Sequence, residues 1–153
     1  MKLRLFATLA VLSASVLLHA AVSPEQKKAM KVVKEAIALG TSGGKDKLLK
    51  EVNMASGKFH VSSESSIYVA IYDLKGVVMG HGYTPAKVGT NRFQTKDVDG
   101  NLYIQEFIKV AKEKGSGWVS YKHEDPATKK LAPKNTYVEL WGDLVVTCGV
   151  HGN

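Results

Sequence analysis

Apolar positions recur along the chain with two different periods, and the first is helical. From Ser23 to Gly40 they fall three and four residues apart, which is the spacing of one face of an α-helix, and Gly40 is predicted to end it. Ser23, Pro24 and Gln26 supply an N-cap, a proline in the first turn and a capping box. After the break "TSGG", a second and shorter helix is expected over residues 45–56.

From Ser66 onward the period changes to that of β-strands. Two runs rich in β-branched and aromatic residues flank Leu74–Gly76, which predicts a β-hairpin. Residues 101–115 return to a helical period, with Gly115 as the C-cap. Three further strands are expected, over residues 117–124, 135–141 and 143–150. This order predicts an α+β fold: a five-stranded antiparallel sheet with a long N-terminal helix and a crossover helix.

The segment before the first helix has the layout of a secretory signal. Lys2 and Arg4 precede an apolar run, and small residues follow it. Residues 1–20 are therefore predicted to be a signal peptide cleaved after Ala20, which would deliver the domain to the periplasm. Leu18 fits poorly at the third position before the cut, so an uncleaved anchor remains the alternative.

The remaining chain, residues 21–153, is expected to form one domain. Residues 21–60 would be an N-terminal helical arm, and residues 66–153 a sheet core that carries any ligand pocket. The formal net charge of +7 comes from lysines spread along the chain, so a nucleic-acid surface is not favoured. A basic chain of this kind favours small anions or a negatively charged membrane surface.

The motifs of common chemical sites are missing or wrongly spaced. "DVDGN" resembles a calcium loop, but its glycine falls fourth where the EF-hand needs it sixth, so a turn is the better interpretation. Cys148 and His151 are spaced like metal ligands, yet one pair does not close a site. The serines lack a nucleophile elbow, and no phosphate-binding glycine loop is present. We therefore predict no catalysis, no metal and no cofactor. The single cysteine is interpreted as a small buried side chain, with an intermolecular disulfide as the alternative.

Three segments carry a resemblance to a known family: "YDLKGVVMGH", "VGTNRFQTKDVDGNLYIQEFIKVAKEKGSGWVSY" and "PKNTYVELWGDLVVTCGV". From Tyr68 to the C-terminus the chain resembles the single Cache domain, second type, an extracytoplasmic sensor module of bacterial chemoreceptors and sensor kinases that also occurs as stand-alone exported proteins. The resemblance implies a PAS-like fold with a pocket between the sheet and the loop–helix segment. It also implies a small carboxylate ligand, such as acetate, propionate, pyruvate or lactate.

The sequence departs from the family pattern at three positions. Gly82 stands where the family has a proline after the hairpin histidine. His123 replaces a tryptophan, and His151 replaces the closing tyrosine. Two aromatic positions have become histidine, so the resemblance leaves the identity of the ligand open.

The candidate ligand-binding residues combine cations with side chains that donate hydrogen bonds. Lys134 lies three residues before Tyr137, and a cation beside a phenol suits a carboxylate. Arg92, the only arginine besides Arg4, offers a planar fork that lysine cannot provide. The full predicted set is His81, Arg92, Trp118, Tyr121, His123, Lys134 and Tyr137.

Each of these residues also has a structural interpretation that stays open. Arg92 could pair with Asp97 or Asp99 on the surface, and His81 could be a satisfied structural histidine. Trp118 points to the face opposite Tyr121 by strand parity and could pack against a helix.

Two functions from different classes follow from these observations. The first is a periplasmic, non-catalytic sensor-type module that binds a small organic acid or similar anion and presents it to a membrane sensor or transporter. The second is a structural or protein-interaction Cache domain without a small ligand, which docks a membrane sensor or forms a homodimer. The first function predicts a cavity lined by polar side chains, whereas the second predicts a sealed core.

Overall fold

The structure is a computed structural model that describes residues 22–60 and 66–152. The predicted signal peptide, residues 1–20, and its cleavage position lie outside the described residues. None of the helices in the described part of the chain combines the length and hydropathy needed to cross a bilayer.

The first helix, α1 (Pro24–Gly43), begins with the predicted capping box. The Ser23 hydroxyl accepts a hydrogen bond from the Gln26 amide at 3.1 Å, and the Gln26 side chain accepts one from the Ser23 amide at 2.8 Å. The prediction that Gly40 ends the helix is wrong. Gly40 is buried against Trp141, where an added Cβ would come within 2.6 Å of the indole ring, so this glycine is there for close packing.

The second helix, α2 (Lys45–Asn53), is three residues shorter than expected and fixes the edge of the sheet. Asn53 accepts a hydrogen bond from the His81 amide at 3.0 Å and donates one to the Met79 carbonyl at 3.3 Å. The last residue of α2 thereby binds the outer strand at the point where a predicted site residue lies.

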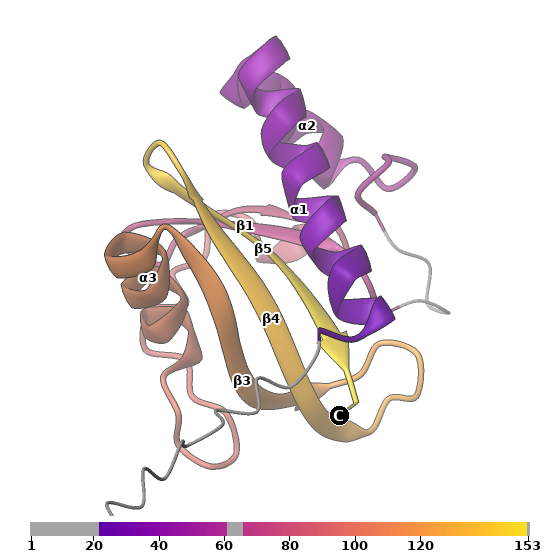
Figure 1. Cartoon of the computed structure of the whole chain (residues 1–153), viewed down its shortest axis with the longest axis vertical. Helices are drawn as coiled ribbons and strands as arrows, with labels where there is room; N and C mark the ends of the chain where they lie inside the picture. The colour runs from indigo at the N-terminus through magenta and orange to yellow at the C-terminus, as the bar shows by residue number, and fades with distance from the viewer. Residues whose placement is uncertain (1–21, 61–65, 153) are drawn as a thin grey trace, which may run out of the picture.

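Five antiparallel strands form a single sheet, as predicted (Figure 1). They are β1 (Val69–Asp73), β2 (Val78–His81), β3 (Ser116–Glu124), β4 (Leu131–Trp141) and β5 (Leu144–His151). Their spatial order is β2-β1-β5-β4-β3, so the first and last strands in the chain, β1 and β5, pair in the middle of the sheet.

The predicted crossover helix connects the two edges of this sheet. The chain leaves edge strand β2, passes a short 3₁₀ turn, η1 (Pro85–Lys87), and returns through α3 (Tyr103–Lys114) to the opposite edge strand β3. Gly115 ends α3 in the left-handed region, at φ 76°, and its amide donates to the Ala111 carbonyl.

Helices cover both faces of the sheet, so there are two cores (Figure 1). The face under α1 and α2 buries Ala29, Val33, Ala36, Leu48, Val52, Val69, Ile71, Leu144, Val146 and Cys148. The face under α3 buries Tyr68, Ala70, Tyr72, Ile104, Phe107, Ala111, Val119, Tyr121, Val138 and Val145. Side chains alternate between these faces along each strand, and that alternation decides which predicted site residues can meet.

Strand β4 begins at Leu131, earlier than the predicted start at Asn135. The preceding turn is closed by backbone hydrogen bonds between Asp125 and Lys130 at 2.9 Å and between Lys129 and Asp125 at 2.8 Å. Because the strand starts early, Lys134 lies inside the sheet and directly opposite Tyr121 of β3.

Candidate functional site

A cavity of about 40 Å³ lies between the sheet and the segment that carries η1 and α3. This volume accommodates about three water-sized groups, similar to the non-hydrogen atoms of formate or acetate. We call it the inner cavity. Its lining residues are Tyr68, Tyr72, Val78, His81, Lys87, Arg92, Tyr103, Ile104, Tyr121 and His123.

Four tyrosines supply most of the polar wall. Tyr68 immediately precedes β1, Tyr72 lies four residues further along within it, and both belong to the core under α3. Tyr103, at the start of α3, stacks on Tyr121 of β3 with ring centroids 4.3 Å apart and planes 5° apart. Burial raises the pKa of Tyr121 to about 12 and also raises the pKa of the other three phenols. All four stay protonated at neutral pH, so their hydroxyls can donate to an anion.

Lys134 brings a positive charge to the back of this wall. Its residue is 2 % exposed, and its ammonium donates to the Tyr68 hydroxyl at 3.0 Å. None of the ion pairs among the described residues includes it. The stem reaches this position across Gly149 of the neighbouring strand, where an added Cβ would lie 2.2 Å from the lysine Cε. A buried ammonium without a carboxylate partner favours an anionic neighbour.

His81 is held as a neutral ring with a defined tautomer. Its Nδ1 accepts hydrogen bonds from the backbone amides of Thr84 at 2.9 Å and Tyr83 at 3.3 Å. Nε2 therefore carries the hydrogen and is the donor of this ring. Burial, followed by the charges of Lys87 and Lys134, lowers the pKa of His81 to about 3. The ring acts as a fixed donor rather than as a cation.

Lys87, Arg92 and His123 complete the wall on the loop side. Burial and the nearby charges of Arg92 and Lys134 lower the pKa of Lys87. The Arg92 Nε donates to Thr90 at 3.2 Å, and no ion pair of the described residues joins Arg92 to Asp97 or Asp99. Both carboxylates instead bind Lys122, through its amide and its ammonium.

The cavity is consequently a region of positive charge walled by hydrogen-bond donors. Among its lining residues, Lys87 and Arg92 are cations and none is a carboxylate. Lys134 adds a third cation behind the lining residue Tyr68. Such a wall stabilises a small anion by direct charge and by charge-assisted hydrogen bonds.

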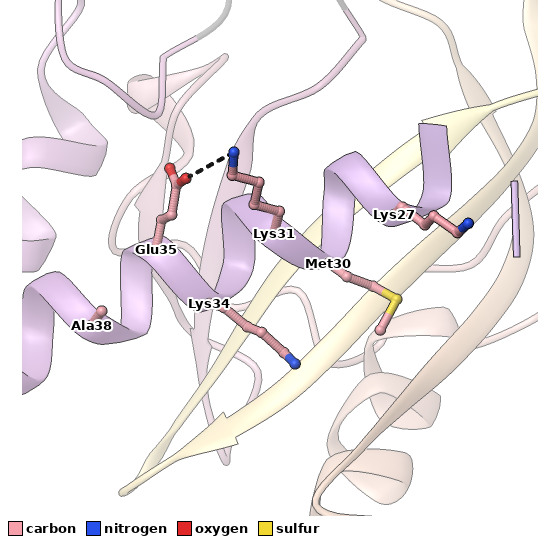
Figure 2. A pocket seen from close by; sticks show the side chains of 6 residues that line it. All are labelled: Lys27, Met30, Lys31, Lys34, Glu35 and Ala38. Atoms are coloured by element: carbon pink, nitrogen blue, oxygen red, sulfur yellow. Dashed lines mark ion pairs between the residues drawn. The ribbon is translucent and has the colours of Figure 1, made fainter. Parts of the chain in front are cut away.

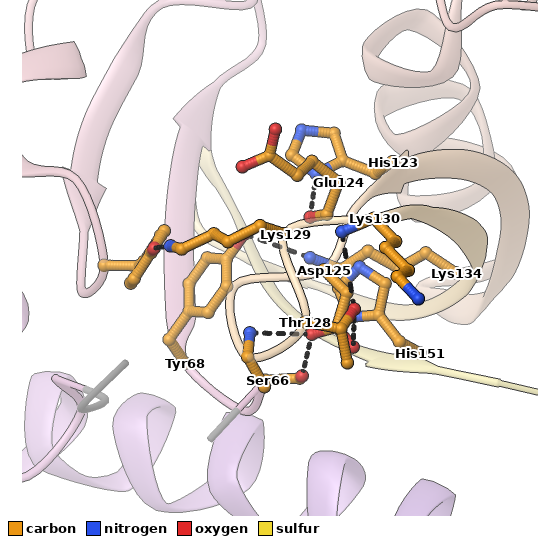
Figure 3. A network of polar contacts seen from close by, with 12 residues as sticks. Ser66, Tyr68, His123, Glu124, Asp125, Thr128, Lys129, Lys130, Lys134 and His151 are labelled. Carbon is orange, nitrogen blue, oxygen red and sulfur yellow. Dashed lines mark hydrogen bonds and ion pairs between the residues drawn. The ribbon is translucent and has the colours of Figure 1, made fainter. Parts of the chain in front are cut away.

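A network of polar contacts closes the end of the sheet next to Lys134 (Figure 3). The Asp125 carboxylate accepts hydrogen bonds from Ser66, from the Ala127 amide at 3.0 Å and from Thr128 at 3.2 Å. His151 Nδ1 lies 3.7 Å from the same carboxylate. Burial and the Lys134 charge lower the pKa of His151 to about 4, so this ring too is neutral at pH 7. The network joins the entry to β1 with the β3–β4 turn.

Of the predicted residues, His81, Arg92, Tyr121 and His123 line the cavity, and Lys134 contacts its wall through Tyr68. The structure does not bring Trp118 and Tyr137 there. These two pair across β3 and β4 on the face under α1, with ring centroids 5.3 Å apart, and the Tyr137 hydroxyl donates to Glu139 at 3.0 Å. The expected meeting of Lys134 and Tyr137 fails because residues three apart on a strand point to opposite faces.

Sequence reasoning missed the lining residues Tyr68, Tyr72, Lys87 and Tyr103. The alternation of Tyr68 and Tyr72 around Ala70 was a usable signal, because it places both phenols on one face of a strand. Lys87 lay in a loop without a period, so its approach to the sheet depends on tertiary contacts.

The departure at Gly82 has a steric explanation. A Cβ at this position would lie 2.2 Å from the Phe59 carbonyl oxygen, and the Gly82 amide donates to the Val69 carbonyl at 2.8 Å. A proline would lose that hydrogen bond and meet the same obstacle. The segment after α2 therefore packs against the hairpin more closely than a proline permits.

Two other features lie away from this cavity. A shallow groove on the exposed side of α1 is lined by Lys27, Met30, Lys31, Lys34, Glu35 and Ala38, with Lys31 and Glu35 3.9 Å apart (Figure 2). Cys148 is buried, and burial raises its pKa to about 12. Within the described residues, no three His, Cys, Asp or Glu side chains form a group that could hold a metal ion.

Comparison with known proteins agrees with this architecture. The family model "Single Cache domain 2" matches residues 25–151. The chain is similar to a methyl-accepting chemotaxis protein from Vibrio parahaemolyticus, with a TM-score of 0.70 and 19 % identity over 83 % of this chain and 88 % of that one. It is also similar to a periplasmic sensor domain of a chemotaxis protein, with a TM-score of 0.63 and 22 % identity over 83 % and 90 % of the two chains. A third structure, described as "Structural basis for carboxylic acid recognition by a Cache chemosensory domain", has a TM-score of 0.68 and 26 % identity over 84 % and 94 %.

Proposed function

Because the chain belongs to the single Cache domain 2 family, we propose that it is an extracytoplasmic sensor module that binds a small organic acid without catalysis. The ligand carboxylate occupies the inner cavity. There it accepts hydrogen bonds from His81 Nε2 and from the tyrosine hydroxyls, and Lys134 and Arg92 balance its charge.

The observation that carries this proposal is the buried Lys134 ammonium, which has the Tyr68 hydroxyl as its partner and no carboxylate within ion-pair distance among the described residues. Placing an ammonium in a protein interior is unfavourable by several kcal/mol unless a counter-charge is supplied. A bound carboxylate supplies that charge. The related Cache structure described for carboxylic acid recognition supports the same class of ligand.

The rival function, a Cache domain that docks a partner without a small ligand, predicts a sealed apolar core. The lining of the inner cavity argues against it, because the polar side chains of the wall are directed to one small space.

A ligand screen with uncharged analogues tests the proposal. Acetate, propionate, pyruvate and lactate are compared with acetamide and propionamide by thermal shift and isothermal titration calorimetry. A ligand at one hundred times its Kd adds about 2.7 kcal/mol to the free energy of unfolding, which raises the Tm by several degrees. We expect at least one acid to bind and its amide to be silent. If every acid leaves the Tm unchanged and gives no heat, the proposal fails.

A further inference from the structure

A second cavity adjoins the inner one on the solvent side. Its volume is about 330 Å³, and we call it the outer cavity. It shares Lys87, Arg92, Tyr103 and His123 with the inner cavity, so the two spaces meet along one wall. Its other lining residues are Thr95, Lys96, Asp97, Val98, Lys122, Glu124 and Leu131.

The volumes limit how a ligand can be placed. The inner cavity accommodates only about three water-sized groups. A ligand longer than acetate must therefore extend past Arg92 and His123 into the outer cavity. The chemistry of the outer wall then decides what the far end of such a ligand can be.

The charge available on the outer wall is mainly positive. Asp97 is already occupied, because it accepts hydrogen bonds from the amides of Asp99, Asn101 and Lys122 and from the Asn101 side chain. These donors lower the pKa of Asp97 to about 2, with the Lys122 amide as the largest cause.

Three cations of the outer wall have no such partner. Lys87, Arg92 and Lys96 form no ion pair with any described carboxylate, and the negative charge of Glu124 acts on Lys87. Lys122, by contrast, is neutralised by Asp99 at 3.1 Å. Together with Lys134, these three cations carry four positive charges against the two carboxylates of Asp97 and Glu124, so one bound carboxylate in the inner cavity leaves one positive charge in excess.

We propose that the preferred ligand is a short dicarboxylate, with one carboxylate in the inner cavity and the other in the outer cavity between Arg92 and Lys96. Lys87 stands at the junction and interacts with both charges. The inference rests on the proposed function, and it specifies which organic acid the site selects. An apolar tail would gain little from an outer wall made of lysines and an arginine.

The test compares succinate with butyrate, which has the same number of carbons and one carboxylate fewer. Isothermal titration calorimetry is run on the full chain, with acetate as the reference ligand. We expect succinate to bind about tenfold or more tightly than butyrate, because a hydrogen bond to a charged group is worth at least that factor. Glutarate serves as a length variant.

Substitution of the outer cation locates the second carboxylate. Lys96→Gln should weaken succinate binding by about threefold or more and leave acetate binding unchanged, since Lys96 lines the outer cavity alone. Lys75→Gln is the matched control, because Lys75 is exposed in the β1–β2 turn and carries the same charge.

The outcomes separate the two proposals. Acetate or propionate binding with succinate no tighter than butyrate overturns the dicarboxylate inference and leaves the proposed function standing. An equal loss of acetate and succinate affinity in Lys96→Gln also overturns it. That result would mean that the Lys96 charge acts on the whole site rather than on a second carboxylate. If no acid of either kind binds, both proposals are wrong.

Discussion

Replacing Lys134 with methionine separates what this side chain does for the ligand from what it does for the fold. Methionine is unbranched and of similar length, so it can follow the same path across Gly149 without the charge. We expect Lys134→Met to weaken carboxylate binding strongly while the ligand-free protein keeps its stability. A residue that serves mainly to hold the fold would show the opposite pattern.

The magnitudes follow from the contacts of the ammonium. A hydrogen bond to a charged group contributes about 1.5–3 kcal/mol, so its loss should raise the Kd about 10- to 150-fold. In the ligand-free protein the substitution removes the hydrogen bond from the charged ammonium to Tyr68, worth about 1.5–3 kcal/mol, and the contact of the ammonium with the Tyr68 ring, 4.6 Å from the ring centroid. It also removes a buried charge whose desolvation is unfavourable by several kcal/mol. The two effects oppose each other and are of similar size, so we expect the free energy of unfolding to fall by no more than about 1 kcal/mol.

Two measurements on each variant check this balance. Urea unfolding at pH 7 gives the free energy of unfolding, and calorimetric titration with the best acid of the screen gives the Kd. Lys130→Met is the matched control: it removes the same charge from an exposed position of the neighbouring turn and should change neither quantity. The reasoning is refuted if Lys134→Met lowers the stability by more than about 1 kcal/mol and binds the acid as tightly as the wild type.

Two further substitutions and one labelling experiment test the surroundings of the site. The pKa of His81 is about 3 in the folded protein and about 6.5 in the unfolded chain, so the unfolded chain takes up the proton first as the pH falls. The free energy of unfolding should therefore decrease between pH 6.5 and pH 3, by about 1.4 kcal/mol per pH unit. His81→Asn keeps an acceptor for the two amides and should flatten that loss in urea unfolding; an unchanged pH profile would contradict the assignment. Gly82→Ala should lower the free energy of unfolding by about 1–3 kcal/mol or more, because the added Cβ would collide with the Phe59 backbone. An unchanged urea midpoint would show that the Phe59 segment moves aside easily. The Cys148 thiol should react with a disulfide reagent only in denaturant, since it is buried with a pKa of about 12; rapid labelling of the folded protein would disprove that burial.

Much of the fold could be predicted because the local signals agree with the tertiary structure. The capping box at Ser23, the two-residue period of the strands and the C-cap at Gly115 all specify structure over a few residues. The predicted helix end at Gly40 was wrong because a glycine can end a helix or allow close packing equally well. Only the position of Trp141 distinguishes these two roles. The early start of β4 was obscured by Pro133, which is tolerated there although it lacks an amide hydrogen.

The site was predicted less completely, for a related reason. Strand parity alone separates Lys134 from Tyr137, so that part was accessible from the sequence. The position of Lys134 opposite Tyr121 depends on the register between β3 and β4, which parity does not give. The alternation of Tyr68 and Tyr72 around Ala70 indicates that both phenols share one face, but it does not distinguish a cavity wall from an ordinary aromatic core. Their role at a cavity depends on how closely α3 approaches the sheet, and no local pattern encodes that distance.

Gly149 is needed for the binding site although no ligand would touch it. Lys134 can reach Tyr68 only while the neighbouring strand leaves its path clear, and any side chain at Gly149 would displace the lysine. The two positions should therefore vary together among relatives, with larger residues at the glycine position accompanying the loss of the lysine. This pair is a compact sequence criterion for separating relatives that keep a charged pocket from those that have lost it. Gly149→Ala likewise offers a way to make a ligand-insensitive sensor while every residue of the cavity wall remains native.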